Sequence, residues 1–369
     1  MTARQRRLGA IRSALCAGDG AAVATLEAET ESQEAVTVPL PAALAALLPE
    51  DAQELVVRAA LPGDETTMSL VTHYGFAMQS DPSEPFEFPS AEGDDRSRIE
   101  KDSTWGAFAG DRAVSQLLAH RWALGSGCKV AAVSGVSTLP EYRRLGLLRT
   151  MMAMLFKDMR RQGQPLAALG ATQAAIYQRY GYGEAVRDVR SYSIDTVDVN
   201  FVDGDAGSCT VIRREITDDL TDTVLRPLYE EFIEGRACAF GFDDTEVFSR
   251  ASNRLSLPAE TLAMFGVARP NSIAVATDAN GDARGYCIYN IGERNEGMTS
   301  FEAGGHPTRF QKLDVKELVY ADTDAYRSIF SFLSRHDLVG EINVGRVPSD
   351  DPAPSIFLEP RLLRTKTIE

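Results

Sequence analysis

The chain has 369 residues, of which 44% are apolar and 25% charged, as is typical of an ordinary globular protein with about two domains. Its formal net charge of −15 argues against nucleic acid and anionic lipid surfaces as partners, because both select a basic protein surface. An acidic exterior attracts cationic small molecules or lysine-bearing partners, although solubility is the more common reason for it.

Cysteine and histidine usage predicts neither a disulfide framework nor a metal site. The 5 cysteines are scattered without a CxxC pair, which is typical of reduced thiols, and the 4 histidines lack metal-ligand spacing. No apolar run reaches the length of a membrane span, and Arg12 and Asp19 interrupt the stretch that would form a signal peptide. We therefore expect a cytoplasmic protein without membrane attachment.

The first part of the chain predicts a helical extension over residues 1–52. Alanine, leucine, glutamate and arginine dominate it, and Gly18–Gly20 interrupts the run. Pro39 and Pro41 precede a second short apolar helix, Ala42–Leu48.

A change of pattern at residue 53 marks the start of an α/β domain, which we expect to reach residue 200. Its apolar and β-branched runs predict strands, its 3.6-residue periodicity predicts helices, and a loop rich in prolines and acids covers residues 80–95. The predicted elements are a strand at Leu55–Leu61, a helix at Asp64–Phe76, a hairpin of Trp105–Phe108 with Gln116–Ala123, and a strand at Lys129–Thr138.

The helix after Pro140 has the clearest periodicity in the chain. Its apolar residues are spaced i, i+3, i+4, i+7 and i+11, which predicts one buried face: Leu148, Met151, Met152, Leu155 and Met159. Gly163 and then Pro165 should end it. We expect a strand at Leu166–Leu169, a helix at Ala174–Arg179 and a last strand of this domain at Arg187–Ile194.

The turn between the predicted strand and this helix has the features of an anion site. The first helical N–H groups have no intrahelical partner, and the helix dipole places its positive end there. Gly146 allows close approach of a phosphate, and Arg143, Arg144 and Arg149 add positive charge. Arginine at a helix start is locally unfavourable, which favours an anion ligand over solvated charges.

A linker with Asp203, Gly204, Asp205 and Gly207 separates a second α/β domain, expected over residues 208–369. Its predicted elements loosely repeat the first order: strand Cys209–Arg213, helix Thr221–Phe232, a hairpin of Ser272–Thr277 with Ala283–Ile291, strand Lys312–Ala321 and helix Thr323–Arg335. In place of the arginine-glycine turn stands Val319–Tyr326, with acids where an anion would lie. We infer a duplicated fold whose second copy does not bind the anion.

The segment Pro140–Arg149 resembles the pyrophosphate-binding motif of the GNAT acetyltransferase superfamily, Q/R-x-x-G-x-G/A, with Leu148 as a departure at its last position. Together with Ile176–Gly183 downstream, it is similar to the enhanced intracellular survival (Eis-like) acetyltransferases over about residues 55–369. The resemblance implies two tandem GNAT-like domains of α/β (α+β) class, with mixed twisted sheets flanked by helices, that use acetyl-coenzyme A without a metal and form a homo-oligomer.

The resemblance also implies a role for each matching residue. Val136, Ser137 and Thr138 match the strand that pairs with the pantetheine arm. The residues that match the pyrophosphate turn are Arg143, Arg144, Leu145, Gly146, Leu147, Leu148 and Arg149. Thr172 and Gln173 match positions beside the cofactor, and Tyr177 matches the general acid that protonates the departing thiolate, although a tyrosine alone is more often a core residue.

In the family that the chain resembles, the base is a C-terminal carboxylate on a third, sterol-carrier-like domain. Asp351–Thr365 resembles the end of the second domain of that family, so we expect either a shortened member that uses another base or a fragment. Glu369 is therefore given no catalytic role, and acids of the 80–95 loop or a water chain are the candidate bases. The favoured function is N-acetyl transfer to a primary amine, either an aminoglycoside-like or polyamine-like molecule or a protein lysine. The alternatives are a coenzyme A-binding module without turnover and the use of another acyl donor.

Overall fold

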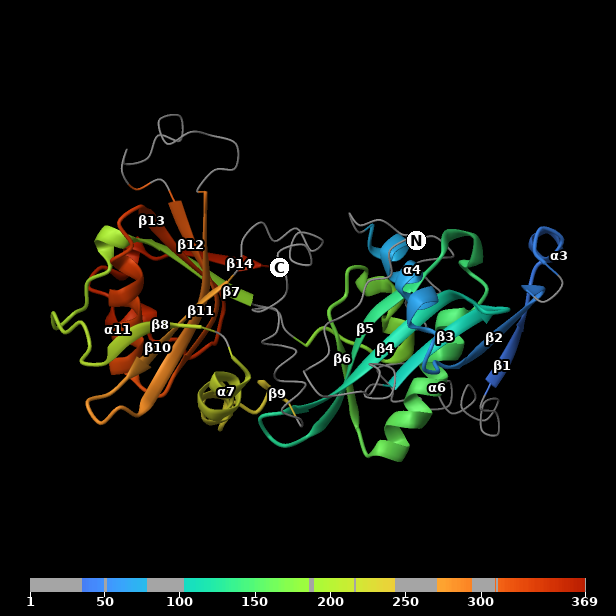
Figure 1. Ribbon diagram of the computed structural model, residues 1–369, viewed down its shortest axis with the longest axis horizontal. Coiled ribbons are helices and arrows are strands. Elements are labelled where there is room, and N and C mark those ends of the chain that lie inside the picture. The colour runs from blue at the N-terminus through green and yellow to red at the C-terminus, as the bar shows by residue number, and fades with distance from the viewer. Residues whose placement is uncertain are drawn as a thin grey trace, which may run out of the picture. The chain divides into compact units, whose positions relative to one another are not determined.

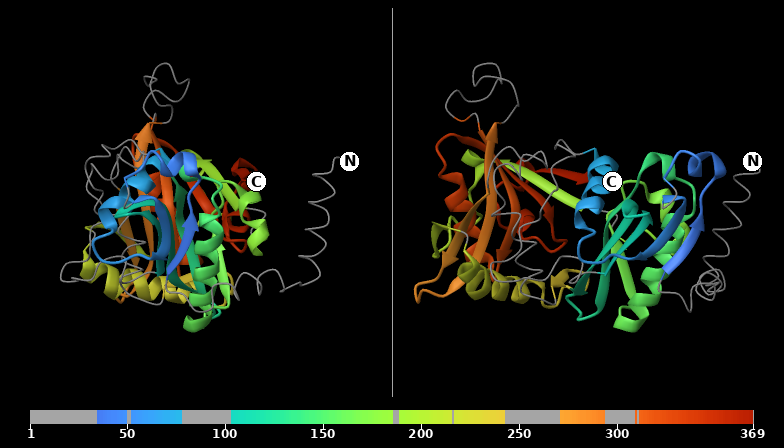
Figure 2. Two further views of the ribbon diagram at one scale, coloured as in Figure 1. Left: turned by 90° about the vertical axis from the view of Figure 1, so that its right-hand side faces the viewer. Right: turned by 45° about the vertical axis from the view of Figure 1, so that its right-hand side comes forward.

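The computed structural model describes residues 35–49, 52–77, 103–185, 189–215, 217–242, 271–293, 309 and 311–368. These residues form two compact units (Figure 1). The first unit takes the described residues up to Glu184 together with Phe240–Phe242, and the second takes the others. Each unit is built on a 7-stranded sheet, and Figure 2 gives two further views of both.

The first sheet is antiparallel except at one edge. Its strand order is β1-β2-β3-β4-β5-β6, with β9 paired to the end of β4, and only β5 and β6 run parallel. The strands are β1 (Ala35–Pro39), β2 (Glu54–Ala59), β3 (Ser103–Ala109), β4 (Arg112–Leu124), β5 (Lys129–Thr138), β6 (Leu166–Leu169) and β9 (Phe240–Phe242).

Two helices cover opposite faces of this sheet. Helix α4 (Glu65–Phe76) places Thr72 against Gln116 of β4, whereas Asp158 of α6 (Leu147–Gln162) accepts a hydrogen bond from Ser103, the cross-strand partner of Ala119. Since side chains alternate along a strand, Gln116 and Ala119 face opposite sides. A short helix, α3 (Ala42–Ala45), lies between β1 and β2 in the chain.

Helix α6 forms as its sequence predicts. Met151, Met152, Leu155 and Met159 are buried in the core of the first unit. The helix ends at Gly163, where φ is +66°, and the Gln164 amide donates to the Met159 carbonyl. This is a Schellman-type end, which relies on the tolerance of glycine for positive φ.

The second sheet has the order β14-β7-β13-β12-β11-β10-β8, and only β12 and β13 run parallel. Helix α11 (Thr323–Ser334) makes the crossover between these two strands and packs on the sheet with its buried face. The strands are β7 (Val189–Asp195), β8 (Thr210–Arg214), β10 (Ser272–Thr277), β11 (Ala283–Glu293), β12 (Gln311–Tyr320), β13 (Val339–Val347) and β14 (Arg364–Ile368).

The two units repeat one topology, which confirms the predicted tandem fold. In each, two antiparallel pairs precede a long hairpin, and a crossover helix then leads to a strand that runs parallel to the last strand of the hairpin. Strands β2, β3, β4, β5 and β6 match β8, β10, β11, β12 and β13. The central pair is also irregular in both units, with one extra residue on β5 near Gly135 and one on β12 at Lys316.

Several local predictions are wrong. Ala35–Pro39 is a strand of the first sheet and not part of a helix, whereas residues 1–34 and the 80–95 loop lie outside the described residues. The segment Ala174–Arg179 forms two 3₁₀ turns instead of an α-helix. The strand predicted at Arg187–Ile194 exists as β7, but it pairs with β13 and β14 of the second sheet.

The predicted helix Thr221–Phe232 begins with a π-helical turn (Thr221–Leu225) that follows α7 (Asp218–Leu220), and it continues as α8 (Arg226–Ile233). Strands β9, β13 and β14 were not predicted. No helix in the described part of the chain is long and apolar enough to cross a membrane.

Candidate functional site

A bulge in β5 opens the first sheet near its centre. Gln116 of β4 pairs with Ser137 and Leu118 pairs with Ser134, so β5 carries one residue more than β4 between these pairs. Gly135 has φ +60°, and a Cβ there would lie 2.6 Å from the Cδ1 atom of Leu118. Only glycine fits this position without strain or a shift of Leu118.

The bulge is held by a side-chain amide. The Nε2 atom of Gln116 donates to the Gly135 carbonyl at 3.1 Å and to the Thr72 hydroxyl of α4 at 2.5 Å. Gln116 is buried, so both hydrogen bonds are shielded from water. Gln116 is not among the site residues predicted from the sequence. The signal that the sequence offered is Gly135, because a glycine within a strand pattern indicates a bulge.

Beyond the bulge, one side of β5 is open. The ladder with β6 runs from Val130 to Val133, so the backbone of Ser134–Thr138 has no β6 partner within the described residues. On the other side, Ser115 of β4 holds the strand end through hydrogen bonds to the Ser137 carbonyl at 3.0 Å and the Thr138 hydroxyl at 2.6 Å. Backbone groups along an open edge of this kind can pair with an extended ligand.

The turn after β5 prepares a helix start without a cap. Arg144 has φ +66° and Gly146 has φ +85°, so the chain passes twice through the left-handed region before α6 begins. The first turn of α6 has no side-chain cap and no acid, and the Thr150 amide is the first to bond back, to the Gly146 carbonyl. The amides of residues 146–149 therefore lack intrahelical acceptors.

Three arginines surround this helix start and differ in what they contact. The Nε atom of Arg143 donates to the Thr138 carbonyl at 3.2 Å, which closes the turn onto β5. Arg144 and Arg149 are exposed, and neither forms an ion pair with an acid within the described part of the chain. Positive charges beside the positive end of a helix dipole are stabilised by a bound anion.

The leucines of the turn anchor it in the core of the first unit. Leu147 is buried, and Leu145 and Leu148 are half-buried against the same apolar cluster. Leu148, the departure from the motif, therefore packs inward on α6. Its backbone amide belongs to the same uncapped first turn.

Tyr177 lies between the two 3₁₀ turns, beside other tyrosines. Its half-buried ring meets Tyr182 edge-on at 5.9 Å, and Tyr182 in turn contacts Phe156 of α6 at 6.5 Å. Burial raises the pKa of Tyr177, so its phenol is protonated at neutral pH. Thr172 and Gln173, which precede these turns, are exposed.

Tyr180 connects this segment to the helix start. Burial raises its pKa, whereas the positive charges of Arg179 and of Arg149 in the first turn of α6 act to lower it. The structure thus brings the tyrosine segment and the arginine turn to the same helix.

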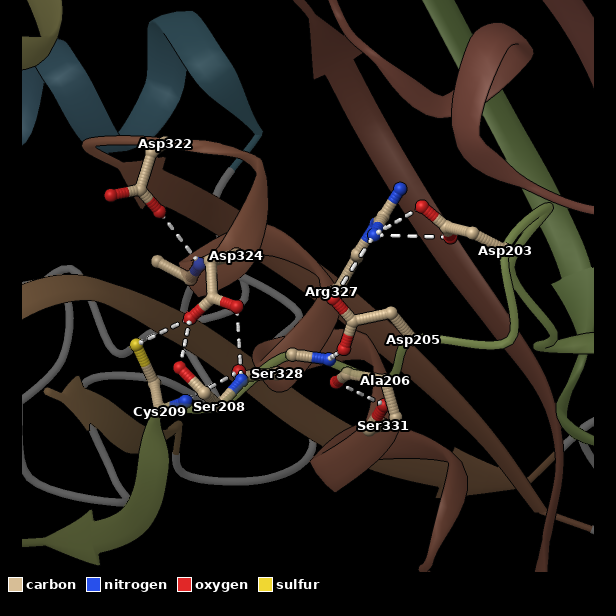
Figure 3. Close-up of polar contacts among 12 residues, drawn as sticks. Asp203, Asp205, Ala206, Ser208, Cys209, Asp322, Asp324, Arg327, Ser328 and Ser331 are labelled. Atoms are coloured by element: carbon tan, nitrogen blue, oxygen red, sulfur yellow. Dashed lines mark hydrogen bonds and ion pairs between the residues drawn. The ribbon is translucent and has the colours of Figure 1, made fainter. Parts of the chain in front are cut away.

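The equivalent helix start in the second unit is already filled (Figure 3). The Asp322 carboxylate caps α11 by accepting from the Ala325 amide at 2.9 Å. The Asp324 carboxylate accepts hydrogen bonds from the Ser208 amide at 3.0 Å, the Ser208 hydroxyl at 2.9 Å and the Cys209 thiol at 3.3 Å. The Asp322 carboxylate therefore accepts from one of the amides that the first unit leaves free, and Asp324 of the same turn binds the Ser208–Cys209 segment.

That segment lies directly on the helix. Gly207 has φ +83°, and a Cβ there would lie 2.2 Å from the Ser328 hydroxyl oxygen and 2.5 Å from the Asp324 carbonyl oxygen. Arg327 of α11 reaches back to Asp203 at 3.1 Å and Asp205 at 3.5 Å. Burial acts to raise the pKa of Asp324, but hydrogen bonds from Ser208 and Cys209 outweigh this effect and keep the pKa of the carboxyl below its usual value.

Among the described residues, no group of three or more histidine, cysteine, aspartate or glutamate side chains is placed to hold a metal ion.

Two family models match the chain, each described as an acetyltransferase (GNAT) domain, over residues 57–185 and 262–368. The chain therefore belongs to the GNAT acetyltransferase superfamily and carries two GNAT domains. An uncharacterized N-acetyltransferase of Streptomyces griseus is 36% identical over 135 residues, which cover 36% of this chain and 31% of the relative.

The N-acetyltransferase Eis of Mycobacterium tuberculosis is 47% identical over 55 residues, or 15% of this chain and 14% of Eis. The chain spans less than two thirds of the length of the curated relatives it matches. Among solved structures, Eis1 of Mycobacterium abscessus shares the fold with a TM-score of 0.60 and 20% identity, over 85% of this chain and 71% of that chain.

Proposed function

We propose that the first unit binds acetyl-coenzyme A and transfers its acetyl group to a primary amine. The observation that carries this proposal is the uncapped start of α6 at the end of a strand that is open along one side. Two exposed arginines, Arg144 and Arg149, lie there and form no ion pair with an acid among the described residues. A diphosphate with an extended amide-containing arm fits this combination of groups. The GNAT family membership supports the same donor.

In this proposal the pyrophosphate lies on the amides of Gly146–Arg149, which the helix leaves without acceptors. The pantetheine arm pairs with the open backbone of Val136–Thr138 in the manner of an added strand. Thr172 and Gln173 border the same arm. Leu145, Leu147 and Leu148 contribute backbone amides and fix the turn by packing, whereas Arg143 closes the turn.

The chemistry is a direct attack of the amine nitrogen on the thioester carbonyl. A backbone amide at the bulge of β5 can stabilise the oxyanion that forms there, in a site where the geometry is already set by Gly135 and Gln116. When the C–S bond breaks, the phenol of Tyr177 gives its proton to the departing thiolate. Its raised pKa keeps that proton in place until the thiolate forms.

The acceptor is proposed by class only. The net charge of −15 favours a cationic amine such as an aminoglycoside-like or polyamine-like molecule, or a lysine of a protein. The 80–95 loop, whose acids are candidates for the base, lies outside the described residues. The cytoplasmic location and the homo-oligomer stay predictions.

The test is release of free thiol from acetyl-coenzyme A in the presence of polyamines, aminoglycosides and lysine peptides. We expect amine-dependent release, and we expect Tyr177→Phe to lower kcat by roughly 100-fold while acetyl-coenzyme A binds almost unchanged. Binding without release for any amine would contradict the transfer activity and support a coenzyme A-binding module. Release from another acyl donor alone would correct the donor.

A further inference from the structure

A histidine and a serine lie next to each other on the two strands that form the bulge. The Nε2 atom of His120 on β4 is 2.8 Å from the Oγ atom of Ser134 on β5. Ser134 directly follows Val133, the last residue of β5 that pairs with β6. Its hydroxyl therefore lies where the sheet opens, one residue before Gly135.

Both side chains face the same side of the sheet as α4. Ser134 is the cross-strand partner of Leu118, and His120 follows Leu118 by two residues, so all three share a face. Gln116, two residues earlier on β4, contacts Thr72 of α4 on that face. The pair thus belongs to the face on which Ser137 packs against Gly75 of α4, whose added Cβ would lie 2.4 Å from the Ser137 Cβ.

A row of aromatic rings orients the imidazole. The ring of Trp122 is stacked on His120 at 6.1 Å with an interplanar angle of 20°, and Phe240 meets Trp122 edge-on at 5.3 Å. Phe240 belongs to β9, a strand that pairs with the end of β4 although it comes from much later in the chain. A half-buried histidine held in this way keeps one ring nitrogen on Ser134.

We propose that His120, through Ser134, is the general base that takes the proton from the attacking amine. This inference rests on the proposed acetyl transfer, because it assigns the one proton acceptor that the reaction needs. The amine is neutral only when something removes its proton, and imidazole is the side chain best suited to do so near neutral pH. The proposal requires the tautomer with the proton on Nδ1, so that Nε2 accepts the hydrogen bond from the Ser134 hydroxyl.

Each proton that moves in this acetyl transfer has a donor and an acceptor. The ammonium form of the amine gives one proton to the Ser134 oxygen as the Ser134 hydroxyl proton passes to Nε2 of His120, and the neutral nitrogen then forms the C–N bond with its own electron pair. The nitrogen of the tetrahedral adduct gives its second proton to solvent. The tetrahedral adduct collapses, the C–S bond breaks, and the sulfur takes the proton of the Tyr177 phenol. The imidazolium then loses its proton to solvent, and the tyrosine regains one from solvent.

Three variants test the assignment in the full-length protein. His120→Gln keeps a polar group that can hydrogen-bond to Ser134 but cannot accept a proton, and we expect kcat to fall by roughly 100-fold with little change in the Kd of acetyl-coenzyme A. His120→Ala should regain part of its kcat when imidazole is added to the assay. Ser134→Ala should lower kcat by roughly tenfold, because the relay is broken while the base remains.

His336→Gln is the matched control. This half-buried histidine of the second unit bonds through both ring nitrogens, to Tyr289 and to the Leu333 carbonyl, and its loss should leave kcat unchanged. A purely structural role of His120 predicts no rescue by imidazole and a lowered melting temperature that accounts for the loss. Wild-type turnover together with an unchanged kcat of His120→Gln overturns this inference alone, whereas absence of turnover in the wild type overturns the proposed function as well.

Discussion

Helices α6 and α11 begin at equivalent points of the two units, but their first turns are satisfied in opposite ways. Helix α6 starts at Gly146 without a cap or an acid, and exposed arginines lie beside it. Helix α11 starts at Asp322, which caps it, and Asp324 in its first turn accepts three hydrogen bonds from Ser208 and Cys209. One topology thus leaves donors for an anion when the helix start has no acid, and makes contacts within the chain when Asp322 caps the helix and Asp324 binds the preceding segment.

The buried faces of the two helices also differ in polarity. Helix α6 presents methionines and a leucine to an apolar core. Helix α11 presents Tyr326, whose hydroxyl bonds to Tyr192 and to the Asp351 carboxylate, the latter at 3.1 Å. In the described part of the second unit, α11 therefore makes side-chain hydrogen bonds both at its start and on its buried face.

The largest effect is expected from moving the acid of the second copy into the first. Gly146→Asp places a carboxylate at the N-cap of α6, where it accepts the amides and repels a pyrophosphate. We expect the affinity for coenzyme A to fall on the order of 100-fold, since like charges in close contact cost several kcal/mol. Isothermal titration with coenzyme A measures this loss.

Gly146→Asn is the control for that substitution. Asparagine has the same shape and tolerates the φ of +85° about as well as aspartate, but it carries no charge. We expect a loss of only a few fold. Equal losses in both variants would mean that backbone fit, and not charge, decides whether the helix start binds an anion.

The second effect concerns the segment that fills the start of α11. Gly207→Ala should lower the free energy of unfolding of the second unit by about 3 kcal/mol, because the new methyl group meets Ser328 and the backbone of Asp324. Gly204→Ala, at φ +70° with no atom within 4 Å, should cost only about 1 kcal/mol. Urea unfolding measures both, and similar costs would show that the segment is not packed tightly on the helix.

The third effect separates charge from backbone strain at Arg144. Arg144→Ala and Arg144→Gly both remove the charge, and each should weaken coenzyme A binding by roughly fivefold. Only glycine relieves the φ of +66°, which is worth about 1 kcal/mol, so its melting temperature should lie roughly 2–4 °C above that of the alanine variant. Identical melting temperatures would mean that the turn stores no strain.

Local patterns predicted those elements whose structure is decided locally. The periodicity of α6, its stop at Gly163, the β10–β11 hairpin and the strand before Pro140 all follow from neighbouring residues. The run at Ala174–Arg179 looks helical by composition but is too short to sustain an α-helix alone, and it forms 3₁₀ turns as Tyr177 and Tyr180 pack against the core.

The remaining features depend on contacts between distant residues. The sequence of β7 shows a strand, but not that its partners are β13 and β14. At the candidate site, the motif indicated the turn and the uncapped helix. The clamp of Gln116 on Gly135 and the pairing of His120 with Ser134 arise only from the register of β4 against β5, which a single sequence does not state.

The smallest effect tests the polar core of the second unit through Asp351. Burial raises the pKa of this carboxyl, with hydrogen bonds from Ala353 and Tyr326 acting against it, and its Oδ2 atom is buried without a hydrogen-bond partner in the described structure. A carboxyl whose pKa is higher in the folded state stabilises the fold fully below its unfolded pKa, and this contribution is lost as the pH rises through the folded pKa. At any pH above its folded pKa, Asp351 is an ionised carboxylate in a place that favours the neutral form. Asp351→Asn is neutral at every pH and keeps an oxygen for Tyr326, so it should unfold at slightly higher urea concentration than the wild type at pH 7, with a difference that shrinks towards pH 4.

A variant that is less stable than the wild type at pH 7 would mean that the hydrogen bonds of Tyr326 and Ala353 compensate the charge in full, and that the core of the second unit depends on an ionised carboxylate.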